Sequence, residues 1–212
     1  WVRSPEQAVR PVVGPGTVML PGAPGAVRVA AVPDVEAEVR NATALGSSRI
    51  STEDLEYASR QLVEIAVRAL SPGINDPHTA MSVLDRLGLA LSEVAPVHMP
   101  TGVWLREDKP VLVIPAFDYD GLVDAMFHMI RQNASSSTAV LARLLEVLTS
   151  VVSIERDNAR AKALQRHADL VIDDAERNID NPSDLADLRL RRRDFEAMWR
   201  QGPTGYIGAP AD

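Results

Sequence analysis

Cysteine is absent from this chain of 212 residues, which excludes disulfide bonds, thiolate catalysis and zinc held by cysteines. Aromatic residues make up 4% of the sequence, and its three tryptophans are widely separated, so a stacking platform for bases or sugars is not expected. Basic residues are also in deficit, 22 against 29 acidic ones, and the net charge of -7 argues against nucleic acid as a partner. We therefore expect neither thiol chemistry nor nucleic-acid binding.

A hydrophobic run of the roughly 20 residues that span a bilayer is missing as well. The best candidate, residues 140–154, is interrupted by Arg143 and Glu146. With 46% hydrophobic residues, the length suits one sizeable globular domain, alone or with a small appendage. We therefore expect the chain as given to be soluble, and its negative charge and lack of cysteine favour the cytoplasmic side.

Glycine and proline are absent from residues 122–181, which favours helices separated only by polar caps. Residues 1–32, in contrast, are rich in glycine, proline and valine, and predict short strands joined by turns. We predict a mainly helical domain over residues 33–201, with a β-hairpin near 102–114, and a loosely ordered tail over 202–212. The predicted fold class is α+β and predominantly α-helical, with a small N-terminal β-rich segment and the hairpin packed with a multi-helix bundle.

Histidine occurs four times, and no two histidines have the three- or four-residue spacing of a metal-binding helix. Acidic residues form no calcium-type loop, so we expect neither a metal nor a cofactor. A Gly-x-Ser-x-Gly nucleophile motif is missing, and serines 135–137 predict a helix cap. Asp173 and Asp174 should point apart on a helix, and we expect them to be solvated or to act as caps. Arg191 to Arg193 alternate with acidic residues, which predicts a solvated, salt-bridged face.

The most informative segment is RALSPGINDPHTA, residues 68–80, which contains a helix end, a tight turn and a new helix start. Pro72 disfavours helical geometry at the residue before it, and Gly73 is free to take a positive φ, so the first helix should end here. Asp76 is then a suitable N-cap, and Pro77 fits the first helical position, where a missing amide hydrogen has no cost. The sequence predicts two helices that meet in a short, stiff elbow.

The elbow admits two interpretations. In the functional one, polar side chains gather beside a helix N-terminus whose free amides could hold an anion. Arg68 would neutralise the ligand, Asp76 or His78 would transfer a proton, and Asn75 would orient the substrate. In the structural one, Asp76 caps the helix, Asn75 bonds to the turn, and Arg68 pairs with Asp76 or Glu64. The structural interpretation is favoured because an aspartate cap competes with an anion for the same amides. The candidate binding residues of the elbow are Arg68, Asn75, Asp76, His78 and Thr79.

The same segment, preceded by QLVEIAV and followed by LDRLG, resembles the signature block of a bacterial family of predicted membrane proteins of unknown function. The resemblance covers mainly residues 46–91, and Arg49 matches it, which adds Arg49 to the candidate binding residues. The sequence departs from the family pattern at Ser48 and Ile50, where Glu and Thr are usual. The resemblance implies a protein of the bacterial cell membrane, anchored by transmembrane helices upstream of Trp1, with this chain as its C-terminal portion outside the bilayer.

Two hypotheses for function follow. In the first, the chain is a soluble, cytoplasmic and non-enzymatic domain of an integral membrane protein, serving oligomerisation, gating or sensing. A homo-oligomer is expected, because the apolar helix surface exceeds what one small domain can cover. In the second, the elbow of residues 68–79 binds or hydrolyses a small molecule. That hypothesis expects a raised pKa for Asp76, or an ion pair between Asp76 and Arg68. The sequence does not decide whether the chain is an enzyme.

Overall fold

The computed structural model describes residues 9–11, 26–28, 41, 55–97, 103–106, 108–113 and 119–208. The chain divides into two compact units, one made of Trp1–Tyr57 and Met99–Asp118 and the other of Ala58–His98 and Tyr119–Asp212. The predicted domain boundaries after residues 32 and 201 stay predictions. Each unit is described by itself.

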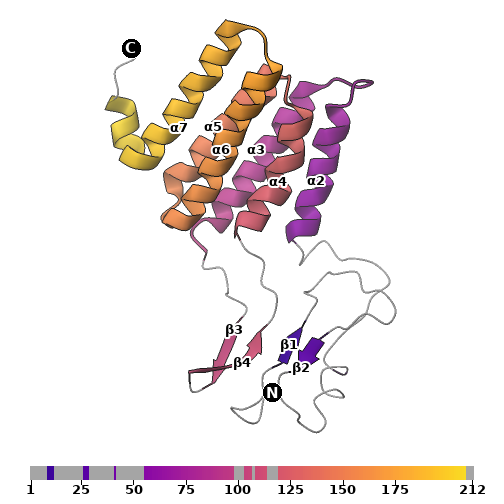
Figure 1. Cartoon of the computed structure of the whole chain (residues 1–212), viewed down its shortest axis with the longest axis vertical. Helices are drawn as coiled ribbons and strands as arrows, with labels where there is room; N and C mark the ends of the chain where they lie inside the picture. The colour runs from indigo at the N-terminus through magenta and orange to yellow at the C-terminus, as the bar shows by residue number, and fades with distance from the viewer. Residues whose placement is uncertain are drawn as a thin grey trace. The chain divides into compact units, whose positions relative to one another are not determined.

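The first unit contains a four-stranded sheet (Figure 1). Its strands are β1 (Val9–Pro11), β2 (Ala26–Arg28), β3 (Val103–Arg106) and β4 (Lys109–Val113). The order is β2-β1-β4-β3, and the β1/β4 pair is parallel while the other two pairs are antiparallel. Asp108 between β3 and β4 has a φ of 59°, which aspartate tolerates better than most residues. The hairpin lies in the range predicted for it. The β-rich character of residues 1–32 and its packing with the helices stay predictions.

The rest of the described chain is helical, which confirms the predominantly α-helical fold. The helices are α2 (Leu55–Ala69), α3 (Pro77–Val94), α4 (Tyr119–Asn133), α5 (Thr138–Ile154), α6 (Asn158–Asn178) and α7 (Pro182–Gly208). Asp157 separates α5 from α6, because its side chain accepts hydrogen bonds from the first amides of α6. Gly202 interrupts α7 with a φ of 70°, at the first residue of the predicted tail, and the chain is helical again up to Gly208. Each helix in the described part is too short or too polar to cross a membrane.

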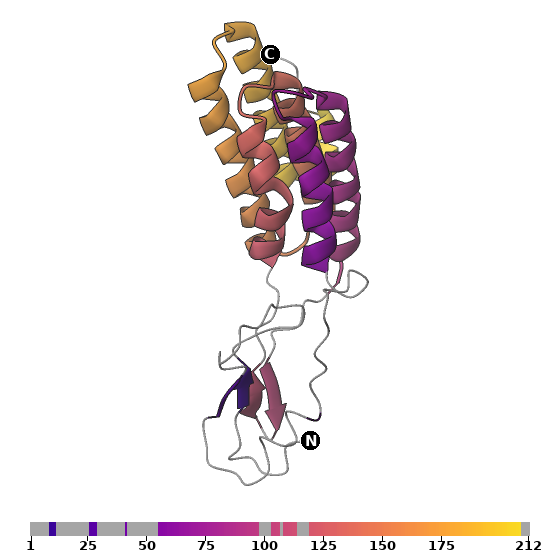
Figure 2. The ribbon, with the colours of Figure 1, turned by 90° about the vertical axis from the view of Figure 1, so that its right-hand side faces the viewer.

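The core of the helical unit is organised around α5, which packs against α3, α6 and α7, while α4 packs against α6. Figures 1 and 2 show these helices side by side. Residues 141–152 form a broad apolar face of α5, and its large side chains are all buried in this core. They are Leu141, Leu144, Leu145, Leu148, Val151 and Val152.

Candidate functional site

The elbow between α2 and α3 is held by hydrogen bonds within itself. Asp76 is the N-cap of α3, as predicted: its Oδ1 accepts from the Thr79 amide at 3.1 Å and its Oδ2 from the Thr79 hydroxyl at 2.6 Å. The Asp76 amide donates to the Ala69 carbonyl at 2.8 Å, which ties the start of α3 to the end of α2. The Thr79 hydrogen bonds lower the pKa of Asp76. The expected raised pKa is therefore wrong, and the carboxylate stays ionised as a cap.

The other candidate residues of the elbow differ in their contacts. Arg68 pairs with Glu64 at 2.8 Å along the exposed side of α2, so the expected ion pair with Asp76 is wrong. Asn75 is exposed and has a φ of 48°, a turn conformation that asparagine tolerates. His78 is exposed on the first turn of α3. Arg49 lies outside the described residues. Among the described candidate residues, Asp76 and Thr79 form a cap, and His78 adds a backbone hydrogen bond and an electrostatic interaction with Asp76.

A second polar cluster lies between α4 and α6, and sequence reasoning missed it. The His167 side chain is fully buried, and its Nε2 lies 2.8 Å from Asp124 Oδ1. Arg166 donates to the same oxygen at 2.9 Å and to Asp120 at 3.0 Å. Burial lowers the pKa of His167 to about 4, so the imidazole is neutral at pH 7 and donates from Nε2 to Asp124. An imidazole with no solvent exposure cannot meet a substrate, so the cluster joins two helices.

A buried ion pair lies in the same helix interface. The Arg131 guanidinium on α4 pairs with the Asp174 carboxylate on α6, and 5% of the arginine side chain is exposed. Asp173 is exposed as expected, but Asp174 is largely buried, so the prediction of a solvated or capping carboxylate is wrong for Asp174. The cause is packing: Asp174 is on the side of α6 that faces α4. A buried charge is retained only when it is paired, as it is here.

One sequence pattern could have predicted that His167 and Arg131 are buried. His167 lies between Leu164, Ala168 and Val171, on the apolar stripe of α6. A histidine or arginine on such a stripe is buried together with it, and must then find a partner on the facing helix. Arg131 follows the buried Ile130 on α4 in the same way. The identity of the partner, in contrast, depends on which helices pack together.

Arg160, near the start of α6, contacts the C-terminal end of α3 and the N-terminal end of α4. Arg160 donates to the carbonyls of Ala95 and Val97, both at 3.0 Å, at the C-terminal end of α3. The same guanidinium lies 5.2 Å from the ring centroid of Tyr119, the buried first residue of α4. Burial, and then the Glu155 carboxylate, raise the pKa of Tyr119. Arg160 therefore acts as a clamp on both places where the chain leaves and re-enters the helical unit.

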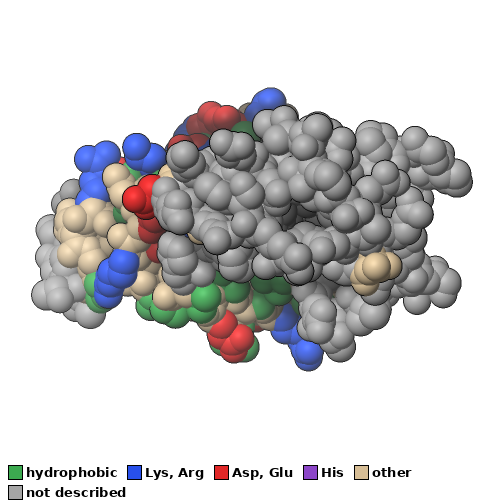
Figure 3. Space-filling view, turned by 90° about the horizontal axis from the view of Figure 1, so that it is seen from below, with side chains coloured by type: hydrophobic (Ala, Val, Ile, Leu, Met, Phe, Trp, Pro, Cys, Tyr) green, Lys and Arg blue, Asp and Glu red, His purple; other side chains and the backbone are tan. Residues whose placement is uncertain are grey.

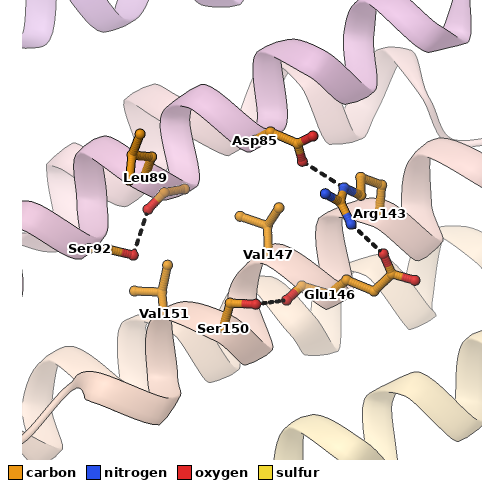
Figure 4. A pocket seen from close by; sticks show the side chains of 9 residues that line it. Asp85, Leu89, Ser92, Arg143, Glu146, Val147, Ser150 and Val151 are labelled. Atoms are coloured by element: carbon orange, nitrogen blue, oxygen red, sulfur yellow. Dashed lines mark hydrogen bonds and ion pairs between the residues drawn. The ribbon is translucent and has the colours of Figure 1, made fainter.

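A pocket of about 310 Å³ lies between α3 and α5 (Figure 4). Gly88 lets the two helices approach each other closely beside it, because a Cβ there would lie 2.5 Å from Val147 Cγ1. The two serines of the pocket bond to their own helices, Ser92 to the Gly88 carbonyl at 2.8 Å and Ser150 to the Glu146 carbonyl at 2.9 Å. Val147 and Val151 add apolar surface. The pocket suits an apolar group, because its hydroxyls already have partners.

The rim of this pocket has charges that neutralise each other. Arg143 on α5 donates to Asp85 on α3 at 2.6 Å and to Glu146 at 2.8 Å (Figure 4). Glu146 also accepts from Arg191 on α7 at 3.2 Å, and Arg191 pairs with Asp187. The salt-bridged character predicted for the arginines at 191–193 is thus confirmed at Arg191. Within the described ranges, no three histidine, aspartate or glutamate side chains gather as metal ligands would.

Comparison with known proteins gives the setting of the chain. The family model for "Predicted membrane protein (DUF2254)" matches residues 1–150. Two similar relatives are the uncharacterized proteins Rv1290c of Mycobacterium tuberculosis and Mb1321c of Mycobacterium bovis. Each is 31% identical over 169 residues, which cover 78% of this chain and 31% of the relative, so the chain spans less than a third of their length. No solved structure matches the chain. Because the family model covers most of the sequence, the chain belongs to the DUF2254 family of predicted membrane proteins.

Proposed function

We propose that this chain is a non-enzymatic assembly domain of a bacterial membrane protein, that it lies outside the bilayer on the cytoplasmic side, and that it forms a homo-oligomer. The membrane would be reached through segments outside this chain. Membership of a family of predicted membrane proteins supports the setting. The observation that carries the assembly role is the α3–α5 pocket, whose polar groups are internally paired and beside which a large apolar side chain, Leu89, is 64% exposed.

The polar clusters of the described residues support a non-enzymatic role. Catalysis needs a titratable group that can reach a substrate and whose pKa suits proton transfer near neutral pH. His167 is buried, Asp76 is a cap with a lowered pKa, and Arg68 is engaged by Glu64. The alternative of a small-molecule site at residues 68–79 loses the two features on which it depended, a raised pKa at Asp76 and its ion pair with Arg68.

The surface of the helical unit supports a protein partner. Large hydrophobic side chains are exposed on several helices, and single ones are normal on a soluble surface. Leu89 differs because it adjoins a pocket of matching chemistry. Figure 3 shows basic and acidic side chains interspersed on the described part of one face, which gives a nucleic acid no continuous basic patch there. The exposed large side chains include Ile65, Leu89, Met129 and Leu190.

Size-exclusion chromatography with light scattering tests this proposal on the 212-residue chain. We expect a mass that rises with concentration from that of the 23.0 kDa monomer to a multiple of it. A monomer at every concentration would contradict the assembly role. A reporter fused to the C-terminus of the complete protein, active only in the cytoplasm, tests the orientation, and a silent reporter on a stably expressed fusion would contradict it.

A further inference from the structure

We propose that the surface formed by α3 and α5 binds a second copy of this chain, with Leu89 of each copy seated in the pocket of the other. This inference rests on the assembly role proposed above and names its partner and surface. Leu89 on α3 lines the pocket and is 64% exposed, next to Gly88, against which Val147 packs. A protruding side chain and a receiving pocket therefore lie within one turn of the same helix.

The adjacency of Leu89 and the pocket suits a two-fold symmetric contact. In such a contact the same patch meets itself, so a protrusion must lie beside a recess that can receive it. Two antiparallel copies of α3 would bring each Leu89 over the pocket of its partner. The pocket volume of about 310 Å³ exceeds that of a leucine side chain. The Leu89 side chain of the other copy, above the buried Val147 and Val151, would supply the apolar contact that an exposed leucine lacks in the single chain.

The charges beside the pocket are compatible with a copy of themselves. Asp85, Arg143, Glu146, Arg191 and Asp187 alternate in sign across α3, α5 and α7, and each pairs with the next. A patch of one sign would repel its own copy, whereas a row of charges that alternate in sign and are already paired repels its copy far less. Each charge also keeps its partner in its own chain, so covering the row leaves no isolated buried charge. These features favour a second copy over a highly charged partner.

The two serine hydroxyls of the pocket can be buried without losing a hydrogen bond. Ser92 and Ser150 donate to carbonyls of their own helices and need no water to satisfy their hydroxyl hydrogens. A small polar ligand would find both hydroxyl hydrogens already engaged. An apolar side chain from a neighbouring copy needs no hydrogen bond and is not disfavoured by these internal hydrogen bonds.

Aspartate substitutions in the 212-residue chain test the proposal. Leu89→Asp is compared with Met129→Asp, which places the same charge at an exposed apolar position of α4. We expect Leu89→Asp to raise the dimer dissociation constant by about tenfold or more, and Met129→Asp to leave it unchanged. Circular dichroism should show the same helix content for both, since each side chain is more than half exposed. Ser150→Arg, which blocks the pocket from α5, should weaken association in the same way.

Covalent capture gives an independent readout, because the natural chain has no cysteine. Leu89→Cys should give a covalent dimer with a short bis-maleimide, and Met129→Cys should give far less. If the chain is oligomeric but Leu89→Asp, Ser150→Arg and the cysteine pair behave like their controls, this surface is wrong and the assembly role stands. If the unsubstituted chain is monomeric at every concentration, both proposals fail. A dimer captured at both cysteines in equal yield would also overturn the surface.

Discussion

The buried imidazole of His167 should make the chain less stable as the pH falls from about 6.5 to about 4. In the folded chain, burial lowers the pKa of His167 from its ordinary value of 6.5 to about 4. Between these values the unfolded chain binds a proton at His167 and the folded chain does not. Acid therefore favours unfolding in this window. The contribution is complete above pH 6.5 and is lost as the pH falls to about 4.

The size of the effect follows from the same two values. A tenfold change in a protonation constant is worth about 1.4 kcal/mol, so the lowered pKa corresponds to about 3 kcal/mol at the acid end of the window. That is a large part of the 5–15 kcal/mol by which domains are typically stable. Burial dominates the shift, and the hydrogen bond to Asp124 opposes it without reversing it.

Urea unfolding of the chain and of His167→Gln at several pH values measures this contribution. Glutamine keeps a neutral amide that can donate to Asp124 but does not titrate, so the variant should lose about 3 kcal/mol less than the natural chain between pH 6.5 and 4. His78→Gln, at an exposed histidine, controls for the loss of a histidine as such. Parallel pH profiles for the natural chain and His167→Gln would refute the reasoning.

Three further substitutions test the packing by urea unfolding at pH 7. Gly88→Ala should cost about 2 kcal/mol despite its better helix propensity, because the new methyl lies 2.5 Å from a methyl on α5. Gly73→Ala, with nothing within 4 Å, should be close to neutral, and equal losses would contradict the close approach. Arg160→Ala should cost about 2 kcal/mol through two lost hydrogen bonds and the lost ring contact, and no loss would contradict the clamp. Asp174→Asn should cost about 3 kcal/mol by leaving the Arg131 charge buried without its carboxylate, and a neutral result would contradict that pairing.

The helix boundaries could be predicted because the chemistry that sets them is local. Asp76 caps α3 through Thr79, three residues away, and Asn181 caps α7 by accepting from the Ser183 amide at 3.0 Å. Gly202 interrupts α7 because it adopts a positive φ. Each signal lies within one turn of the residue it controls, so no knowledge of packing is needed. The apolar face of α5 was predictable for the same reason.

The contacts between helices could not be predicted in this way. Arg131 and Asp174 are 43 positions apart, and Arg160 and Ala95 are 65 apart. Many acidic residues lie at comparable distances along the chain, and only the packing of α4 on α6 selects Asp174. The elbow was a misleading candidate for the opposite reason. Its polar residues are close in sequence, but a cap and a turn use their hydrogen-bonding groups before a ligand could.

The elbow and the Arg160 clamp together explain why α3 is suited to present a docking surface. Asp76 and Thr79 fix its first turn, and Arg160 holds the carbonyls at its last turn. A helix fixed at both ends presents Leu89 in one position, which lowers the entropy lost on association. Arg160→Ala should therefore weaken dimerisation although Arg160 lies outside the pocket, whereas Arg156→Ala, at an exposed position between α5 and α6, should not. Equal dissociation constants for the two variants would show that α3 needs no such support.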